Sequence, residues 1–408
     1  MSRPPTTTPD TAARPFSSVN PGPAVGMPDG AEGLALIKPA VRAQSAYTLS
    51  APAARRKLNQ NESPWDVPAG LKHEVLTAAE AAAWNRYPEF APPELVAALA
   101  EHYGWTPEGV LVGNGSNELI QATLATTLEA GDVVVAPTPT FSLYRLLTGV
   151  LGGRYRPVPL GPDYGYDVDA LVDAAARERA RVVVLNSPNN PTGSALPPGA
   201  VERLLEETGA LVVCDEAYQE FGGPTALPLL RETSRVVVLR TFSKALGMAG
   251  LRFGLALAHP TVARELAKGK LPYNVNLVTL AAAAAALRHR DELAARVGRI
   301  VEQRGRLVAG LSKLPALSVY PSAANFVLIR CLRQPAREVF RRLLDEHGIL
   351  VRDVSAGSDL AQCLRISVGT AEDVDAVVEA LGRITEGGVT DRGTEGREEG
   401  NDSRTAGL

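Results

Sequence analysis

Short runs of β-branched and other apolar residues alternate with longer segments of helical periodicity along most of the chain. The segments from Pro92 to about His102 and from Ser116 to Leu128 begin with proline or serine and end shortly before a glycine, as helices do. Because strands that alternate with helices form parallel sheets, this order predicts an α/β fold with a mostly parallel, mixed sheet covered by helices. The predicted strands are Val133–Ala136, Arg181–Leu185, Leu211–Cys214, Val236–Leu239 and Phe253–Ala258.

The pattern changes near residue 290, where a long, arginine-rich amphipathic segment begins and continues to about Leu314. Two strand-like segments, Asn325–Ile329 and Leu364–Val368, and helical segments from Pro335 and Ala371 follow it, which predicts a smaller α+β domain. The expected organisation is a disordered tail (1–33), an N-terminal segment that packs with the small domain as a lid (34–66), a large domain (67–289), the small domain (290–385) and a second disordered tail (386–408).

Composition narrows the class of protein without identifying it. The chain has 408 residues, of which 45% are hydrophobic and 21% charged, so it can build two cored domains. A net charge of −3 gives no broad basic field for nucleic acid, and no apolar stretch is long enough to span a membrane. Cys214, Cys331 and Cys363 lie far apart in apolar runs, which indicates reduced, buried thiols and favours a cytoplasmic location.

Two strand ends carry residues that suit cofactor chemistry. Lys244, in Thr241-Phe242-Ser243-Lys244, follows an apolar strand and is placed to form a Schiff base, although an isolated lysine is more often a solvated surface residue. Asp215 ends the strand before it and is placed to pair with a protonated pyridine nitrogen. Glu216, taken alone, is better explained as the N-cap of a following helix.

Two further segments allow both a structural and a functional interpretation. Asn186-Ser187-Pro188-Asn189-Asn190-Pro191-Thr192-Gly193 is dense in turn-forming residues, and a tight loop alone would explain it. Gly115-Ser116-Asn117 lies where a strand ends and a helix starts, so its backbone N–H groups can bind a phosphate, but helix capping explains it equally well.

The order of these segments is more specific than any one of them. Read together, the chain from about Ile37 to Gly382 resembles the class I and II aminotransferases of pyridoxal-phosphate fold type I, and among them the histidinol-phosphate aminotransferases. The residues that carry the resemblance are Gly115, Ser116, Asn117, Phe141, Asn190, Asp215, Tyr218, Lys244 and Arg252.

The resemblance implies that pyridoxal 5'-phosphate is the cofactor and that Lys244 both holds it and shuttles a proton. It implies that Asp215 binds the pyridine nitrogen and that Asn190 and Tyr218 bind the phenolic oxygen. Phe141 would stack on the ring, where many family members carry tyrosine. The phosphate ligands would come from the segment Gly115-Ser116-Asn117, from Ser243 and from Arg252.

The resemblance also implies residues for the substrate and for a second subunit. Tyr87 matches a tyrosine that reaches the neighbouring subunit's cofactor phosphate in a homodimer, although a tyrosine that anchors a loop before Pro88 is the alternative. The implied substrate-binding residues are Tyr47 in a mobile N-terminal segment, Asn190, Tyr273, Asn325, Arg352 and Arg365. Asn61-Glu62-Ser63-Pro64 replaces the family's Asn-Glu-Asn-Pro, with no evident catalytic consequence.

The activity implied is transfer of an amino group between L-histidinol phosphate and 2-oxoglutarate, a step of histidine biosynthesis, without nucleic-acid or membrane partners. Two rivals keep the cofactor: an aromatic or broad-specificity aminotransferase and a threonine-phosphate decarboxylase. The rivals outside enzymes are a pyridoxal-phosphate-binding regulatory domain and a scaffold with a decayed site. The first would need a winged-helix domain for which the N-terminus leaves no room, and the second would leave gaps in the cofactor set.

Overall fold

The computed structural model describes residues 30–45 and 52–386, and the chain divides into two compact units, Met1–Ser45 and Ala46–Leu408. In the first unit the described residues form two short helices, α1 (Ala31–Ala35) and α2 (Pro39–Arg42). Helix α1 begins inside the segment that was predicted as a tail. The rest of that segment, the tail after residue 386 and Tyr47 lie outside the described residues.

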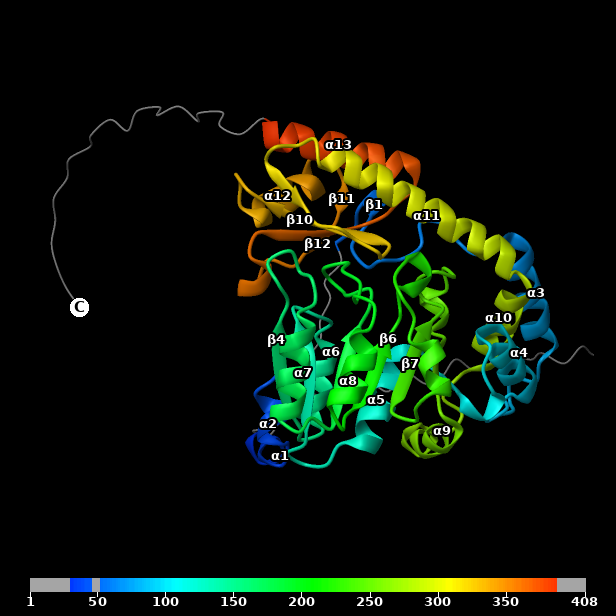
Figure 1. The fold of residues 1–408 in the computed structure, drawn as a ribbon. Coiled ribbons are helices and arrows are strands. Elements are labelled where there is room, and N and C mark those ends of the chain that lie inside the picture. The colour runs from blue at the N-terminus through cyan, green and yellow to red at the C-terminus, as the bar shows by residue number, and fades with distance from the viewer. Residues whose placement is uncertain (1–29, 46–51, 387–408) are drawn as a thin grey trace, which may run out of the picture. The chain divides into compact units, whose positions relative to one another are not determined.

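The second unit contains a seven-stranded sheet, drawn in the lower part of Figure 1. Strands β7, β6, β5, β3 and β4 are parallel, whereas β8 runs antiparallel to both of its neighbours. In spatial order the strands are β2 (Val110–Gly113), β8 (Gly254–Ala258), β7 (Val236–Thr241), β6 (Leu211–Asp215), β5 (Val182–Asn186), β3 (Val133–Thr138) and β4 (Arg154–Pro159). The predicted mostly parallel, mixed sheet is confirmed.

Both faces of this sheet are buried, which explains why its central strands are apolar throughout rather than alternating. Val236 and Val238 face one hydrophobic core and Val237 and Leu239 face another. The first core is completed by α3 (Ala69–Ala81), α4 (Pro93–Tyr103), α7 (Val168–Arg177), α8 (Ala200–Glu207) and α10 (Leu277–Arg288). The second is completed by α5 (Ser116–Thr127), α6 (Leu143–Val150) and α9 (Pro260–Leu266).

The strand β4 was missing from the predicted set. Its sequence, Arg-Tyr-Arg-Pro-Val-Pro, contains two prolines and has neither a continuous apolar run nor a clean alternation. Proline cannot donate a ladder hydrogen bond and is therefore confined largely to sheet edges. Because β4 is an edge strand, hydrogen-bonded only to β3, it tolerates a composition that argues against a strand in isolation.

A second, four-stranded antiparallel sheet lies in the upper part of Figure 1. Its order is β12 (Arg352–Asp353), β13 (Cys363–Ser367), β10 (Phe326–Cys331) and β9 (Leu317–Val319). It shares a core with α11 (Arg290–Leu311), α12 (Ala336–Asp345) and α13 (Ala371–Glu386). The strands predicted near 325–329 and 364–368 are observed as β10 and β13, which pair antiparallel. Separately, β1 (Arg56–Lys57) pairs in parallel with β11 (Ile349–Leu350).

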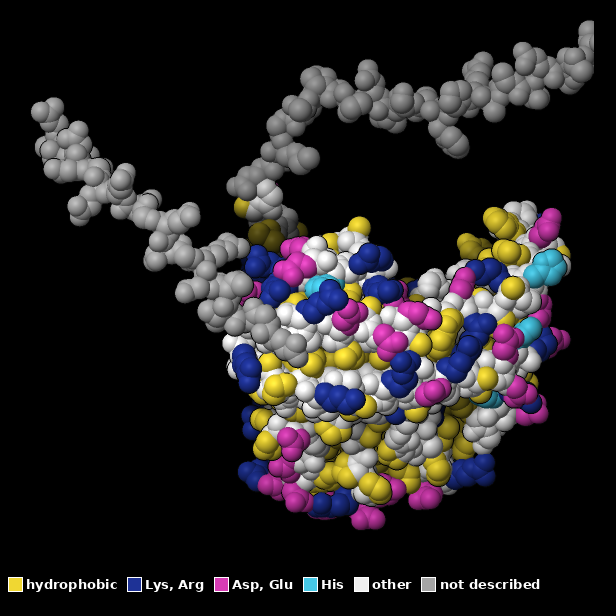
Figure 2. Space-filling model, turned by 90° about the horizontal axis from the view of Figure 1, so that it is seen from above, with side chains coloured by type: hydrophobic (Ala, Val, Ile, Leu, Met, Phe, Trp, Pro, Cys, Tyr) yellow, Lys and Arg dark blue, Asp and Glu magenta, His cyan; other side chains and the backbone are white. Residues whose placement is uncertain are grey.

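The short 3₁₀ helices connect these elements. They are η1 (Pro107–Gly109), η2 (Gln219–Phe221), η3 (Leu227–Arg231), η4 (Ala249–Leu251), η5 (Ala267–Gly269) and η6 (Ser358–Leu360). On the face drawn in Figure 2, basic and acidic side chains are interspersed, without a broad field of one sign. All three cysteines are buried and unpaired, as predicted. Across residues 30–45 and 52–386, no helix combines the length and apolarity needed to cross a membrane.

Candidate active site

The carboxyl ends of β5, β6 and β7 form one wall of a cavity of about 620 Å³. Register places Asn186 beside Asp215 and Asp215 beside Leu239, so residues that follow these strands are neighbours at one edge of the sheet. Many of the predicted site residues line this cavity: Ser116, Asn117, Phe141, Asn190, Asp215, Tyr218, Ser243, Lys244, Arg252, Arg352 and Arg365.

Asp215, the last residue of β6, is a buried carboxylate with 3% of its surface exposed. The hydroxyl of Tyr144 donates to its Oδ2 at 2.6 Å, and the backbone N–H of Ala217 donates to Oδ1 at 3.2 Å. Burial raises the pKa of Asp215, and these two hydrogen bonds oppose the rise. Among the described residues no cationic side chain forms an ion pair with Asp215, so the cavity presents a carboxylate suited to a positively charged ligand.

Lys244 lies in the loop between β7 and β8, and its Nζ donates to the backbone carbonyl of Gln60 at 2.9 Å. Burial, reinforced by the positive charge of Arg365, lowers the pKa of Lys244 to about 8. A lowered pKa means that a larger fraction of the amine is neutral and nucleophilic near neutral pH. Lys244 is therefore not a solvated surface lysine, because it lines the cavity in surroundings that favour the neutral amine.

The start of α5 also lines the cavity, through Ser116 and Asn117. No side chain caps this helix, whose N-cap is Gly115, so the N–H groups of its first turn can receive an anion. Arg252 donates to Ser243 Oγ at 3.0 Å, and its guanidinium packs so closely on Gly115 that a β-carbon there would collide with it. A β-carbon on Gly254 would likewise collide with the N–H of Ser116. These residues form a compact cradle whose N–H groups and guanidinium suit an anion.

Arg352 and Arg365 form the wall contributed by the four-stranded sheet. The two residues are direct cross-strand partners on β12 and β13. Arg365 is buried, donates to Asn190 Oδ1, and donates to the carbonyl of Asn59 at 2.7 Å. Like charges at directly opposed positions are unfavourable, so this wall suits a ligand that carries negative charge.

Several cavity residues were not identified from the sequence. They are Asn59, Gln60, Asn61, Glu62, Thr140, Ser142, Asn186 and Asp353. Asn61 belongs to the Asn61-Glu62-Ser63-Pro64 segment but was given no role in the site, and its Nδ2 donates to the hydroxyl of Tyr218 at 3.0 Å. Tyr144 was missed as well, and its position three residues after Phe141 was the available signal. The contacts of Asn61 with Tyr218 and of Tyr144 with Asp215 could not be inferred, because each joins two segments that are far apart in the sequence.

Besides Gly115, three predicted residues of the described part of the chain lie away from the cavity lining. Tyr87 is 80% exposed and stacks on Tyr273, which is 45% exposed, with ring centroids 4.5 Å apart. Phe90 packs edge-on against Tyr273 at 5.8 Å, and we call these three side chains the aromatic patch. Asn325 is buried and donates to the carbonyl of Asn61 at 3.0 Å, so it supports a cavity segment rather than facing the cavity itself. The described residues contain no cluster of three or more metal-binding side chains.

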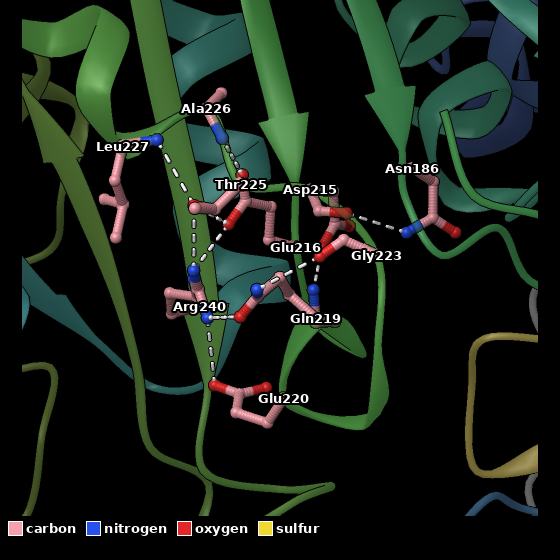
Figure 3. Close-up of polar contacts among 11 residues, drawn as sticks. Asn186, Asp215, Glu216, Gln219, Glu220, Gly223, Thr225, Ala226, Leu227 and Arg240 are labelled. Carbon is pink, nitrogen blue, oxygen red and sulfur yellow. Dashed lines mark hydrogen bonds and ion pairs between the residues drawn. The ribbon is translucent and has the colours of Figure 1, made fainter. Parts of the chain in front are cut away.

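Glu216, the residue after Asp215, takes part in an ionic network shown in Figure 3. Arg240 on β7 pairs with Glu216 at 2.6 Å and with Glu220 at 3.2 Å. Glu216 also accepts from the backbone N–H of Ala226 at 2.6 Å and from Thr225 Oγ1 at 2.8 Å. The interpretation of Glu216 as a helix N-cap is therefore wrong, because its carboxylate turns inward to a buried arginine.

The family model for aminotransferase class I and II matches residues 56–381, which include every predicted site residue except Tyr47. The chain belongs to this family. As a class I and II aminotransferase it acts on small-molecule substrates.

The aminotransferase is similar to proteins of known name over most of its length. It is 40% identical to the histidinol-phosphate aminotransferase of Prosthecochloris aestuarii, covering 86% of this chain and 98% of that protein. It is 38% identical to the one from Chlorobaculum tepidum, covering 86% of this chain and all of that protein (100%). A solved histidinol-phosphate aminotransferase from Sinorhizobium meliloti, in complex with pyridoxal-5'-phosphate, matches with a TM-score of 0.78 at 28% identity, covering 86% and 97% of the two chains.

Replacing Arg240 with methionine should destabilise the aminotransferase by about 3–5 kcal/mol, because the buried Glu216 and the partly buried Glu220 would lose their counterion. Burial already raises the pKa of both carboxyl groups, and loss of Arg240 should raise them further. The folded state would then hold protons that the unfolded chain releases, so the deficit should grow as pH rises from about 5 to 8. Thermal unfolding across this pH range measures it.

Arg203→Met is the matched control. Arg203 also lies between two carboxylates, Asp169 at 2.6 Å and Glu207 at 3.0 Å, but on the surface. Solvent screens such pairs, so its melting temperature should barely change. Equal losses in the two variants would contradict the importance assigned to the buried network.

Proposed function

We propose that this aminotransferase uses pyridoxal 5'-phosphate to transfer the amino group of L-histidinol phosphate to 2-oxoglutarate, giving imidazole-acetol phosphate and L-glutamate. The observation that carries the choice of substrate is the cross-strand pair Arg352 and Arg365 on the cavity wall. A doubly cationic wall suits a phosphorylated amine and a dicarboxylic keto acid, which use the same site in turn. The named relatives, at 38% and 40% identity, support the same choice.

The residues of the cavity fit the cofactor at each of its polar groups. The cradle at the start of α5, with Arg252 and Ser243, suits the phosphate. Asp215, buried without a cationic partner among the described residues, suits a protonated ring nitrogen. Asn190 and Tyr218 lie on the cavity wall, where they would serve the phenolic oxygen, and Phe141 would cover a ring face.

When bound, pyridoxal 5'-phosphate supplies an electron sink for negative charge at the substrate's α carbon. Asp215 would keep its carboxylate ionised opposite the ring nitrogen and so maintain that sink. Lys244 would hold the cofactor through Nζ and, once released by the incoming amine, would take the proton from the α carbon and return it on the cofactor side. Its lowered pKa, about 8, suits a base that must be neutral near physiological pH.

We further propose a homodimer in which Tyr87 serves the partner subunit's cofactor phosphate. Tyr87, Phe90 and Tyr273 place three aromatic rings together at the surface of one chain. Aromatic side chains gathered at an exposed site are typical of interface anchors. The aromatic patch therefore supports a second copy of this chain as its cover.

Cofactor-loaded protein should show a visible absorbance band that L-histidinol phosphate bleaches and 2-oxoglutarate restores, because the two half-reactions move the amino group on and off the cofactor. Lys244→Ala should lack the restored cycle, since no amine remains to hold the cofactor and move the proton. A band that responds to phenylalanine or threonine phosphate but not to histidinol phosphate would favour a rival substrate. A protein that forms no band with saturating cofactor would contradict the cofactor itself.

Replacing Arg352 with glutamine should lower kcat/KM for L-histidinol phosphate by about 10- to 100-fold, the size of one charge-assisted hydrogen bond to a phosphate. Amino donors without a phosphate should lose much less, and steady-state kinetics with both kinds of donor measure the difference. Arg333→Gln is the control, because Arg333 is an exposed arginine outside the cavity lining. A uniform loss for all donors would argue that Arg352 supports the fold rather than the phosphate.

Heterodimers that carry Tyr87→Ala in one subunit and Lys244→Ala in the other should recover activity that neither parent homodimer has. One of the two sites would then combine an intact Lys244 with the partner's intact Tyr87, giving about half of wild-type activity per dimer. Differently tagged subunits, co-expressed and purified through both tags, allow the measurement. If Tyr87 acted within its own subunit, no site would be complete and the mixed dimer would stay inactive.

A further inference from the structure

Residues 59–62, the cavity segment, cross between the two sheets and contact three groups of the site. The carbonyl of Asn59 accepts from Arg365, and the carbonyl of Gln60 accepts from Lys244. The side chain of Asn61 donates to the hydroxyl of Tyr218. Only this last contact comes from a side chain, so it is the one that a substitution can remove without changing the backbone.

The backbone of Asn61 is held in an uncommon conformation. Its φ is +56°, in the left-handed region that asparagine tolerates better than most residues. Its N–H donates to Ser367 Oγ at 2.8 Å, and its carbonyl accepts from Asn325 Nδ2 at 3.0 Å. The four-stranded sheet and its neighbouring loop therefore fix where the Asn61 side chain begins.

The same serine also fixes which way the Asn61 amide faces. Because Ser367 Oγ accepts from the Asn61 N–H, its own proton is available to Asn61 Oδ1, which lies 3.1 Å away. With Oδ1 turned toward Ser367, Nδ2 faces Tyr218 and donates to its hydroxyl oxygen at 3.0 Å. A hydroxyl has one proton, so a Tyr218 oxygen that accepts from Asn61 gives its proton to a different acceptor.

We propose that Asn61 is a positioning residue that directs the hydroxyl proton of Tyr218 toward the phenolic oxygen of the bound cofactor. The inference rests on the proposed function, in which Tyr218 serves that oxygen. Ser367 orients the Asn61 amide, Asn61 donates to the Tyr218 hydroxyl oxygen, and the proton of that hydroxyl would be directed to the phenolic oxygen. Tyr218 would thereby favour negative charge on the phenolic oxygen.

This arrangement predicts an effect on the proton shared by the cofactor and Lys244. A donor to the phenolic oxygen stabilises its negative charge, most of all after the nitrogen that joins Lys244 to the cofactor has lost its proton. Loss of the donor should therefore raise the pKa of the coloured cofactor. The other charged groups around the same cavity are Lys244 itself, Arg365, Arg252, Arg352, Glu62, Asp215 and Asp353, and the test substitutions leave each of them in place.

Asn61→Gly removes the side chain while keeping a residue that accepts positive φ. In the cofactor-loaded protein, the pH at which the absorbance band changes should rise by about half to one pH unit, as expected for one neutral hydrogen bond. Tyr218→Phe should shift the band in the same direction and at least as far. The double variant should titrate like Tyr218→Phe alone, because Asn61 acts through the Tyr218 hydroxyl.

Two further variants separate positioning from a general structural effect. Ser367→Ala removes the group that orients the amide, so it should give a smaller shift in the same direction, and it replaces Asn61→Gly as the test if that variant does not fold. Asn276→Gly is the matched control, because Asn276 caps α10 through Thr279 and lies outside the cavity lining. Its band should titrate like that of the wild type.

The outcomes distinguish the inference from the proposed function. The inference would be overturned if the wild-type band changes with pH and the bands of Asn61→Gly and Ser367→Ala change at the same pH. That result would leave the cofactor assignment intact. A shift in Asn61→Gly that adds fully to that of Tyr218→Phe would also overturn it, since Asn61 would then act elsewhere. No band in the wild type would overturn the proposed function and this inference together.

Discussion

The carboxyl ends of parallel strands share one edge of a sheet, and the site depends on this constraint more than on any single contact. Strands β5, β6 and β7 are buried along their lengths, so their backbones leave little freedom in where the following residues emerge. Asn186, Asp215 and the loop that carries Lys244 therefore meet although they are separated in the sequence. The four-stranded sheet needs only to supply the facing wall.

Placing charged groups at this edge costs free energy, because the groups are removed from water. The chain offsets that cost with dedicated partners. The hydroxyl of Tyr144 donates to the Asp215 carboxylate. Arg240 pairs with Glu216 and donates to Gln219, the residue after Tyr218. The supporting residues are as deeply buried as the groups they hold. Orientation of the cavity residues is thus a product of core packing, not of the loops alone.

Residues that follow apolar strands are visible in a sequence because the signal is local. Lys244, Asp215 and Asn190 could be identified in this way, as could the central strands and the helix beginning at Ser116. The partners of these residues could not, because a hydrogen bond depends on where two distant segments meet. Ser367 is 306 positions from Asn61, and Tyr144 is 71 positions from Asp215. The interpretation of Glu216 as a helix N-cap is wrong for the same reason, because its partner Arg240 lies on another strand.

The arginine pair on the cavity wall connects the geometry of the four-stranded sheet with the charge around Lys244. Arg352 and Arg365 stand directly opposite each other on β12 and β13, where like charges repel. Burial and, next to it, the positive charge of Arg365 lower the pKa of Lys244. An anionic substrate bound at this pair would reduce the repulsion and weaken the effect of Arg365 on Lys244. In the proposed function, binding of an anionic substrate and the basicity of Lys244 would therefore be coupled through charge.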